Sequence, residues 1–380
     1  MINIKSTRIF IDGSVISSKK QSGIGHLVLN LLKEISINSE YRHIKITIFC
    51  TKDEINYIES YKFLSFRVKS IPIVNRRILN MLNKLNIILP LDLYLGNGMY
   101  LFPNFINYPV SRRSQSFTWI HDLSFEKFPK TVSPKLQKNF HKNVGKWIKR
   151  STKVITLSNF IKSEIQEVYS IDSRKVEVVY CGVNTKHFYK RNKSEINSVK
   201  KKYNLPENYI LHIGNIEPRK NLELFLYAYA SIKNELTQKY GLVLIGGNGW
   251  NNSQTYAVID ELKAKGINIV LPRQYVTDKD LPAIISGATV AVSPSLYEGF
   301  GMTPLESLAC GTKTLVSDIP THREIYGDSV LKFDPRNIND MAISLEGILL
   351  NKTKVTHSQI VEEYTWSSTV DRLIKIISES

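Results

Sequence analysis

Short apolar runs alternate with longer amphipathic segments along almost the whole chain, and this alternation limits the folds open to it. Segments of helical length, such as 222–233 and 256–265, lie between the runs. Strands that alternate with helices form βαβ units, whose strands run parallel. The pattern therefore predicts an α/β protein. Nine runs have the character of strands: residues 8–11, 44–49, 117–120, 154–157, 209–213, 242–245, 267–271, 289–292 and 314–316.

The length of 380 residues exceeds one ordinary domain, and the series of runs starts again near residue 209. We therefore expect two doubly wound, Rossmann-like domains that face a cleft. The first covers residues 1–190 and the second covers residues 191–380, with the junction near the lysine-rich stretch 184–202. The last helix is a candidate to pack back on the first domain.

The composition is that of a globular protein, with 42% hydrophobic and 22% charged residues. No stretch approaches the ~18 consecutive apolar residues of a spanning helix. The first ten residues do not resemble a signal peptide. Cys50, Cys181 and Cys310 are odd in number and widely spaced, unlike a disulfide set or a metal knuckle. These features predict a cytoplasmic location.

The net charge of +17 is carried by the first half of the chain. Residues 1–190 contain 30 Lys and Arg against 13 Asp and Glu, whereas residues 191–380 contain 21 of each kind. Such asymmetry predicts a polyanionic partner, either nucleic acid or an anionic membrane surface. Segments 75–89 and 135–150 mix cations with apolar residues, which suits a membrane interface. The alternative is that their apolar faces pack on the N-terminal sheet.

Ligands of doubly wound sheets bind beyond the carboxyl ends of the strands, and two features of the first half lie there. Gly23 and Gly25 follow the first run and open a helix, where glycines and free amides suit a phosphate. A plain turn is the alternative for them. His121 directly follows the run 117–120 and is a candidate for hydrogen bonding or proton transfer in a cleft. A structural histidine is the alternative.

The adjacent cations Arg219 and Lys220 follow the run 209–213 and precede a helix. Cations are unfavourable at a helix start, because the helix dipole is already positive there. An anionic ligand would resolve this conflict, and Arg with Lys suits a diphosphate. The alternative is a solvated, charged turn.

The stretch SLYEGFGMTPLES, residues 295–307, carries Glu298 and Glu306 on either side of a Gly-Phe-Gly turn. Thr303 to Glu306 has the form of a capping box, with Thr303 as N-cap, which gives Glu306 a structural explanation. Glu298 has no such explanation. The turn and the amides that follow it suit an anionic or polyhydroxylated ligand.

One further pair of carboxylates, Asp278 and Asp280, resembles a metal-binding pair of some sugar transferases. Thr277 to Asp280 is also a capping box that opens the helix 281–286, and no other carboxylate cluster lies nearby in sequence. We favour the structural interpretation, so no metal and no other cofactor is expected.

Together these motifs resemble the retaining glycosyltransferases of family 4, which have the GT-B architecture. Residues 298–306 are similar to the E-x7-E element of that family, and Gly214 to Asn221 resembles its G-x-x-x-x-R-K-N segment. Gly23-Ile-Gly25 looks like its N-domain glycine loop, and residues 178–184 look like its interdomain entry. The resemblance covers nearly the whole chain.

The resemblance implies a role for each motif, with a nucleotide-sugar as substrate. Arg219 and Lys220 would neutralise the donor diphosphate, which Gly23 and Gly25 would approach from the other domain. Glu306 would bind the ribose. The remaining residues would act on the transferred sugar, with His121 and Glu298 as the candidate catalytic residues. His121 would contact the sugar near the reacting carbon, and its hydroxyls would be bound by Glu298, Phe300, Gly301, Met302 and Thr303.

Further similarities, in residues 120–129 and 321–328, are to bacterial mannosyltransferases that build O-antigen or capsule. They imply transfer of mannose from GDP-mannose to a lipid-linked glycan, at the inner face of the cell membrane. Gln274 replaces a glycine that relatives often carry before the base-binding loop, so a UDP- or dTDP-sugar is an alternative donor. A nucleotide-sugar epimerase is a second alternative. A dehydrogenase fingerprint is incomplete, and no motif for nucleic acid is recognised.

Overall fold

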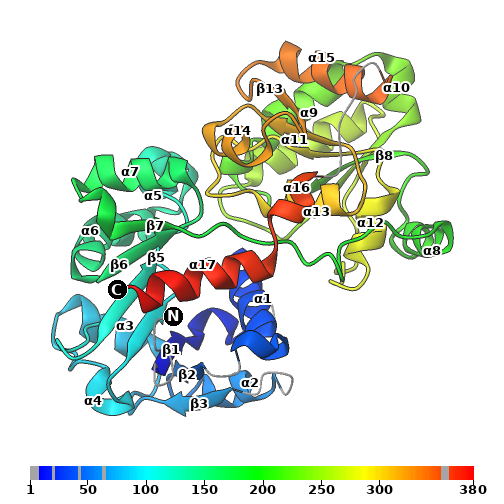
Figure 1. Ribbon diagram of the computed structural model, residues 1–380. Helices are drawn as coiled ribbons and strands as arrows, with labels where there is room; N and C mark the ends of the chain where they lie inside the picture. The colour runs from blue at the N-terminus through cyan, green and yellow to red at the C-terminus, as the bar shows by residue number, and fades with distance from the viewer. Residues whose placement is uncertain (1–7, 19–21, 42–43, 62–65, 352–358) are drawn as a thin grey trace. The chain divides into compact units, whose positions relative to one another are not determined.

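The computed structural model describes residues 8–18, 22–41, 44–61, 66–351 and 359–380. The chain divides into two compact units, shown in Figure 1. Unit 1 comprises residues 1–123, 138–182 and 366–380, and unit 2 comprises residues 124–137 and 183–365. The units therefore change at residue 183, whereas the sequence pattern predicted 191. Residues 124–137 group with unit 2, and the last helix groups with unit 1.

The sheet of unit 1 is parallel throughout its described strands. Its strand order is β3-β2-β1-β4-β5-β6-β7, so the chain winds outward from β1 in one direction and then in the other. Crossovers of this kind require helices between the strands. The strands are β1 (Arg8–Asp12), β2 (Lys45–Cys50), β3 (Arg67–Ser70), β4 (Met99–Phe102), β5 (Gln115–Trp119), β6 (Lys153–Thr156) and β7 (Val176–Val178).

The helices of unit 1 follow these strands in the alternation that the sequence predicts. The terminal helix α17 (Trp366–Ser378) packs beside α1 (Gly23–Ile37), and Tyr41 donates a hydrogen bond of 2.6 Å to Asp371 of α17. This contact joins the two ends of the described chain. The other helices of unit 1 are α2 (Ile55–Glu59), α3 (Arg76–Lys84), α4 (Asp92–Leu95), α6 (Pro134–Arg150), which begins in unit 2, and α7 (Asn159–Tyr169).

The sheet of unit 2 is parallel as well, with the order β10-β9-β8-β11-β12-β13. The strands β8 and β11 are therefore neighbours at the centre, although they are far apart in sequence. Their carboxyl ends meet at one edge of the sheet, where ligands of such sheets bind. The strands are β8 (Tyr209–Ile213), β9 (Gly241–Ile245), β10 (Ile269–Val270), β11 (Val290–Ser293), β12 (Thr314–Ser317) and β13 (Leu331–Phe333).

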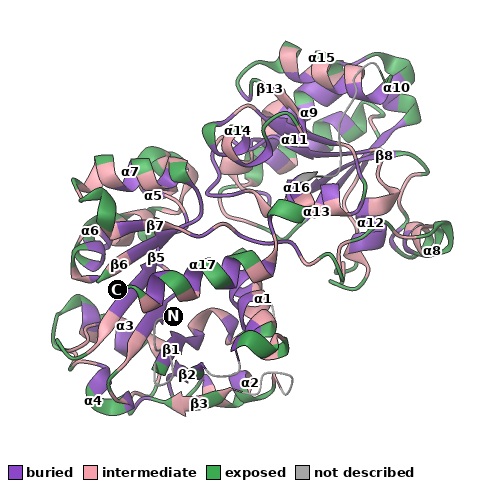
Figure 2. Cartoon of the chain, in the orientation of Figure 1, coloured by how far each residue is buried: buried purple, intermediate pink, exposed green. Residues whose placement is uncertain are grey.

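Helices cover both faces of the unit 2 sheet. Ile210 of β8 packs in a core with α9, α11 and α15, whereas its neighbours Tyr209 and Leu211 pack in a second core with α8 and α12. The strands are buried in Figure 2, as expected for a sheet covered on both sides. The helices of unit 2 are α5 (Ser124–Lys127), α8 (Lys193–Tyr203), α9 (Leu222–Ser231), α10 (Asn234–Lys239), α11 (Ser253–Ala264), α12 (Leu281–Gly287), α13 (Met302–Ala309), α14 (Pro320–Tyr326), α15 (Ile338–Leu349) and α16 (Gln359–Glu363).

The fold confirms the predicted α/β class with two parallel, doubly wound sheets. Each of the nine predicted runs overlaps an observed strand, and β8 has the predicted bounds. The strands that the pattern missed are β3, β4, β7 and β13, each of three or four residues. Three of them, β3, β7 and β13, carry charged residues and at most two apolar ones, so they lack the apolar run on which the prediction depends. Over the described residues, no helix is both long and apolar enough to span a membrane.

Candidate functional site

The candidate site lies in unit 2, at the carboxyl ends of β8 and β11. A single turn of 3₁₀ helix, Pro218–Lys220, follows β8, and the loop 294–301 follows β11. Because β8 and β11 pair side by side, these two segments are brought together. The backbone confirms it, since the amide of Leu296 donates to the carbonyl of Arg219 at 2.9 Å.

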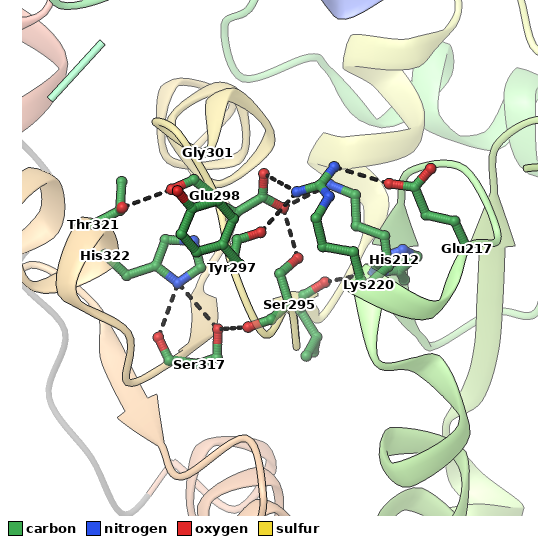
Figure 3. A network of polar contacts seen from close by, with 12 residues as sticks. His212, Glu217, Lys220, Ser295, Tyr297, Glu298, Gly301, Ser317, Thr321 and His322 are labelled. Atoms are coloured by element: carbon green, nitrogen blue, oxygen red, sulfur yellow. Dashed lines mark hydrogen bonds and ion pairs between the residues drawn. The ribbon is translucent and has the colours of Figure 1, made fainter. Parts of the chain in front are cut away.

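Glu298 is the centre of a polar network shown in Figure 3. One oxygen of its carboxylate accepts hydrogen bonds from Lys220 at 2.6 Å and from Ser295 at 2.7 Å. The other oxygen accepts a hydrogen bond from Arg219 at 2.8 Å. Only 8% of Glu298 is exposed, and the side chains of Arg219 and Lys220 are 16% and 18% exposed. A buried carboxylate is thus paired with two cations at the edge of the sheet.

The two cations determine the charge of Glu298. Burial on its own would raise the pKa of the carboxyl, because a charged group loses hydration in the interior. Arg219 and Lys220 outweigh this effect and lower the pKa below its usual value of 4.5. Glu298 is therefore a carboxylate at neutral pH. Arg219 has two further acceptors, the carbonyl of Tyr297 at 2.7 Å and the carboxylate of Glu217 at 2.9 Å.

The pairing changes one expectation from the sequence. We expected the cations at residues 219 and 220 to require an anionic ligand, and the chain itself supplies an anion to each of them. They also precede α9 in a separate turn, since Asn221 begins that helix with a φ of 56°. The conflict with the helix dipole is therefore smaller than the sequence suggested.

The helix α13 begins earlier than the capping box predicted, so the predicted box is wrong. Gly301, with a φ of 89°, is the N-cap, and Met302 is the first helical residue. No side chain caps this end, and Thr303 lies within the first turn. A left-handed glycine lets the chain turn into the helix two residues sooner. Glu306 is consequently released from the structural role that the motif offered.

Glu306 lies on α13 as a partly buried carboxyl. Burial raises its pKa to about 8, and the nearby carboxylate of Asp278 adds to the effect. An uncompensated carboxyl of this kind is typical of a binding or catalytic position.

The residues around the start of α13 are held by neighbours from α14. Thr321 donates a hydrogen bond to the carbonyl of Glu298 at 2.6 Å, and the hydroxyl of Tyr326 donates to the carbonyl of Gly301. The ring of Phe300 is buried against Tyr364, with centroids 5.5 Å apart, so only its backbone can meet a ligand. Met302 and Thr303 are partly exposed beside it.

Two buried histidines of this region were not predicted as site residues. His212 of β8 bonds through Nδ1 to the carbonyl of Val292 at 3.1 Å, and His322 of α14 bonds through Nδ1 to the carbonyl of Ser317 at 2.9 Å. The Nε2 atoms of both have no hydrogen-bond partner among the described residues. Burial lowers the pKa of each to about 4, so both rings are neutral. The sequence feature that could have indicated His212 as a site residue is its position inside the apolar run 209–213.

Gly23 and Gly25 lie in unit 1, at the start of α1. Ser22 is the N-cap and accepts a hydrogen bond from the amide of Gly25 at 3.3 Å. Gly23 is exposed and helical, and a Cβ added to it would meet no atom of the described residues within 4 Å. The described part of the fold therefore does not require glycine at this position. A helix generally gains stability when such a glycine is replaced by alanine.

His121 also lies in unit 1, just after β5, and it is buried with 6% exposure. Its Nε2 is 2.6 Å from the carbonyl of Pro103, and its ring is parallel to that of Trp119. Burial lowers its pKa, so the ring is neutral. These contacts give His121 a structural role, and Nδ1 is the nitrogen that could serve a ligand.

Asp280 is committed to structure. It accepts hydrogen bonds from Lys202 at 2.7 Å and from Tyr203 at 2.6 Å. The predicted capping box at Thr277 has a different geometry, because its hydroxyl donates to the carboxylate of Asp280 and no side chain caps α12. Within the described ranges, no three His, Cys, Asp or Glu residues are grouped so that they could hold a metal ion.

The fold, with two parallel α/β domains, is one that glycosyltransferases have. Residues 21–187 match the Glycosyltransferase Family 4 domain, and residues 193–365 match Glycosyl transferases group 1. The chain belongs to these glycosyltransferases, as its motifs predicted.

Two of the similar proteins are named as O-antigen chain mannosyltransferases. The chain is 28% identical to O-antigen chain mannosyltransferase B of Escherichia coli over 334 residues, which cover 84% of each protein. It is also 28% identical to O-antigen chain mannosyltransferase RfbU of Salmonella typhimurium over 303 residues, which cover 76% of this chain and 77% of the relative.

The similarity to solved structures extends over nearly the whole chain. Sucrose-phosphate synthase from Thermosynechococcus elongatus has a TM-score of 0.71 at 18% identity and covers 98% of this chain and 99% of its own. HepE of Anabaena, in complex with UDP and glucose, has a TM-score of 0.72 at 14% identity and covers 98% and 100%. At these identities the likeness establishes the fold, which is GT-B.

Proposed function

We propose that this glycosyltransferase moves mannose from GDP-mannose to a lipid-linked glycan in the synthesis of a bacterial surface polysaccharide. The observation that carries the proposal is the paired Arg219 and Lys220 beside buried Glu298, at the carboxyl ends of β8 and β11. Two cations at this edge suit the diphosphate of a nucleotide-sugar. The names of the similar O-antigen mannosyltransferases support the choice of sugar and pathway.

Transfer would proceed with retention and without a metal cofactor. The bond between the anomeric carbon and the diphosphate oxygen breaks, and the acceptor oxygen bonds to the same face of that carbon. The acceptor proton goes to the departing diphosphate oxygen. Arg219 and Lys220 would stabilise the charge that develops on the diphosphate, the task that a divalent ion performs in other transferases.

The remaining site residues have proposed roles around the donor. Glu306 would bind the ribose hydroxyls, a role left open now that it does not cap α13. Glu298 and the amides of residues 300–303 would bind the transferred sugar, while Gly23 and Gly25 would approach the diphosphate. His121 would contact the sugar through Nδ1, because its Nε2 already meets Pro103.

A thermal-shift panel of nucleotide-sugars tests the donor. The nucleotide-sugar that binds most tightly at a given concentration raises the unfolding temperature most. We expect GDP-mannose to exceed UDP-glucose, UDP-N-acetylglucosamine and dTDP-rhamnose. A larger shift with a UDP-sugar would overturn the donor assignment and favour the donor class of the HepE complex. Conversion of the donor to an isomer without an acceptor would instead identify an epimerase.

A further inference from the structure

Exposed apolar side chains are concentrated in one segment of unit 1. Among the described residues, sixteen large hydrophobic side chains are exposed, and eight of them lie between positions 74 and 94. Single exposed apolar residues are ordinary on a soluble protein, but a group of this size marks an interaction surface. The eight, with their exposed fractions, are Val74 (60%), Ile78 (39%), Met81 (52%), Leu85 (61%), Ile87 (62%), Leu89 (56%), Leu93 (66%) and Tyr94 (39%).

The segment that carries these side chains, residues 74–94, is fixed by core packing and hydrogen bonds within unit 1. Leu79 of α3 is fully buried in the core, and the side-chain amide of Asn83 donates to the backbone carbonyl of Asn107 at 2.9 Å. Arg150 of α6 donates to Asn83 at 3.0 Å. The inner side of α3 therefore packs and forms hydrogen bonds within unit 1. Its outer, apolar side consequently stays at the surface.

Arg76 anchors the first turn of α3 in the same way. Its guanidinium lies 2.9 Å from Asp12, the last residue of β1, and 2.7 Å from Glu54. The side chain of Arg76 is only 17% exposed, so these are partly buried ion pairs. The outward apolar residues thus belong to a preformed surface and not to a loosely attached helix.

The charge of the segment identifies its partner. From residue 60 to residue 91 the sequence contains no Asp or Glu, and Arg77 and Lys84 are exposed on α3 among the apolar side chains. Arg77, Met81, Lys84 and Leu85 line one shallow hollow with Asn80. Cations interleaved with apolar residues on an amphipathic helix match anionic lipid headgroups above acyl chains.

The other basic helix, α6, does not have this form. Its apolar residues Val144, Trp147 and Ile148 are buried, and the ring of Phe140 lies 4.8 Å from that of Phe105. The apolar face of α6 therefore packs inward, as the packing alternative held. Leu136 is its single large apolar residue that is exposed, so its exposed lysines add positive charge without a group of apolar side chains.

We propose that residues 74–94, the lipid-docking face, bind the chain to an anionic lipid surface. The inference rests on the proposed function for its purpose, since a lipid-linked acceptor lies in such a membrane. The docking face would bring unit 1 to the acceptor without a spanning helix.

Flotation of the full chain with lipid vesicles tests the docking face. We expect binding to vesicles of equal parts phosphatidylglycerol and phosphatidylcholine at low salt, with loss at high salt and weak binding to phosphatidylcholine alone. The triple variant Ile78→Ser/Met81→Ser/Leu85→Ser should bind about tenfold less or weaker still, because three apolar anchors are lost. Arg77→Gln/Lys84→Gln should lower binding to the anionic vesicles only.

A matched control changes three exposed apolar residues of unit 2, two in α15 and one at its C-cap, namely Ile338→Ser/Ile343→Ser/Leu350→Ser. This variant should bind vesicles as the unchanged protein does. Equal binding by the α3 variant, or equal binding to both vesicle types, would overturn the proposal. A dimer in light scattering that the α3 variant dissociates would also overturn it, because the face would then join two copies. Donor binding, measured separately by thermal shift, tests the proposed function, and its failure would leave the vesicle result standing.

Discussion

The ammonium group of Lys220 lies 2.6 Å from the carboxylate of Glu298, on two loops that are brought together by the neighbouring strands β8 and β11. Arg219 approaches the other oxygen of the same carboxylate at 2.8 Å. The residues proposed to bind the donor diphosphate are therefore held in position by a buried carboxylate before any substrate arrives. Such prior positioning removes the entropy that two long side chains would otherwise lose on binding.

Replacing Lys220 by Met should destabilise the protein and weaken donor binding. The substitution leaves Glu298 buried with one cation instead of two, and breaking a buried ion pair costs about 3 kcal/mol or more. The partial exposure of Lys220 and the remaining ion pair of Glu298 with Arg219 reduce the expected loss to about 1–3 kcal/mol. Urea denaturation measures this free energy, and thermal shift with the donor measures binding.

The double variant Lys220→Met/Glu298→Gln provides the control. It removes the stranded charge as well, so part of the stability should return while donor binding stays weak. If the single variant bound GDP-mannose as tightly as the unchanged protein, Lys220 would not be a diphosphate ligand.

Glu306 should make stability depend on pH near neutrality. Its pKa is raised from 4.5 in the unfolded chain to about 8 in the folded protein, so between these values the folded state holds a proton that the unfolded state has lost. Stability is therefore greatest below the unfolded value and falls as pH rises toward about 8. Each pH unit between these values changes the stability by about 1.4 kcal/mol, so Glu306→Gln should remove a fall of up to about 3 kcal/mol between about pH 5 and about pH 8. Urea midpoints at several pH values measure it.

Asp278→Asn refines this prediction, because the carboxylate of Asp278 contributes to the raised pKa of Glu306. The variant should shift the pH dependence to lower pH and leave it present. Parallel pH profiles for the unchanged protein and Glu306→Gln would show that Glu306 is ionised in both states, contrary to its burial.

The location of the candidate site in the chain could be predicted, because its motifs lie in loops that follow strands. Arg219, Lys220 and Glu298 were assigned to one site from their motifs and from the rule that ligands bind at carboxyl ends of strands. The structure brings all three within hydrogen-bond distance. Periodicity is a strong signal for long buried strands such as β8, and it places the loops between them.

The contacts within the site could not be predicted in the same way. That Glu298 would meet the two cations follows from the pairing of β8 with β11, which are separated by β9 and β10 in sequence. The capping box failed because Gly301 entered a left-handed conformation, which a local motif does not reveal. The hidden Nε2 atoms of His212 and His322 likewise depend on tertiary packing.

Gly301→Ala should destabilise unit 2. Its φ of 89° is one that side chains disfavour by roughly 1–2 kcal/mol, and the added Cβ would lie 3.1 Å from Nε2 of His322. The matched control is Gly247→Ala, whose Cβ would meet Asn215 at the same distance without a positive φ. Chemical denaturation should give a clear loss for the first variant and a smaller one for the second. Equal losses would mean that contact, not backbone conformation, explains the glycine.

Gly23→Ala separates a role in the fold from a role in binding. The residue is helical and an added Cβ would meet none of the described atoms within 4 Å, so the variant should gain about 0.4–1 kcal/mol of stability. The same methyl group would enter the space proposed for the donor diphosphate, so kcat/KM should fall about tenfold or more. Denaturation and a transfer assay with labelled donor measure the two effects. A variant that is more stable and fully active would show that the diphosphate does not approach this end of α1.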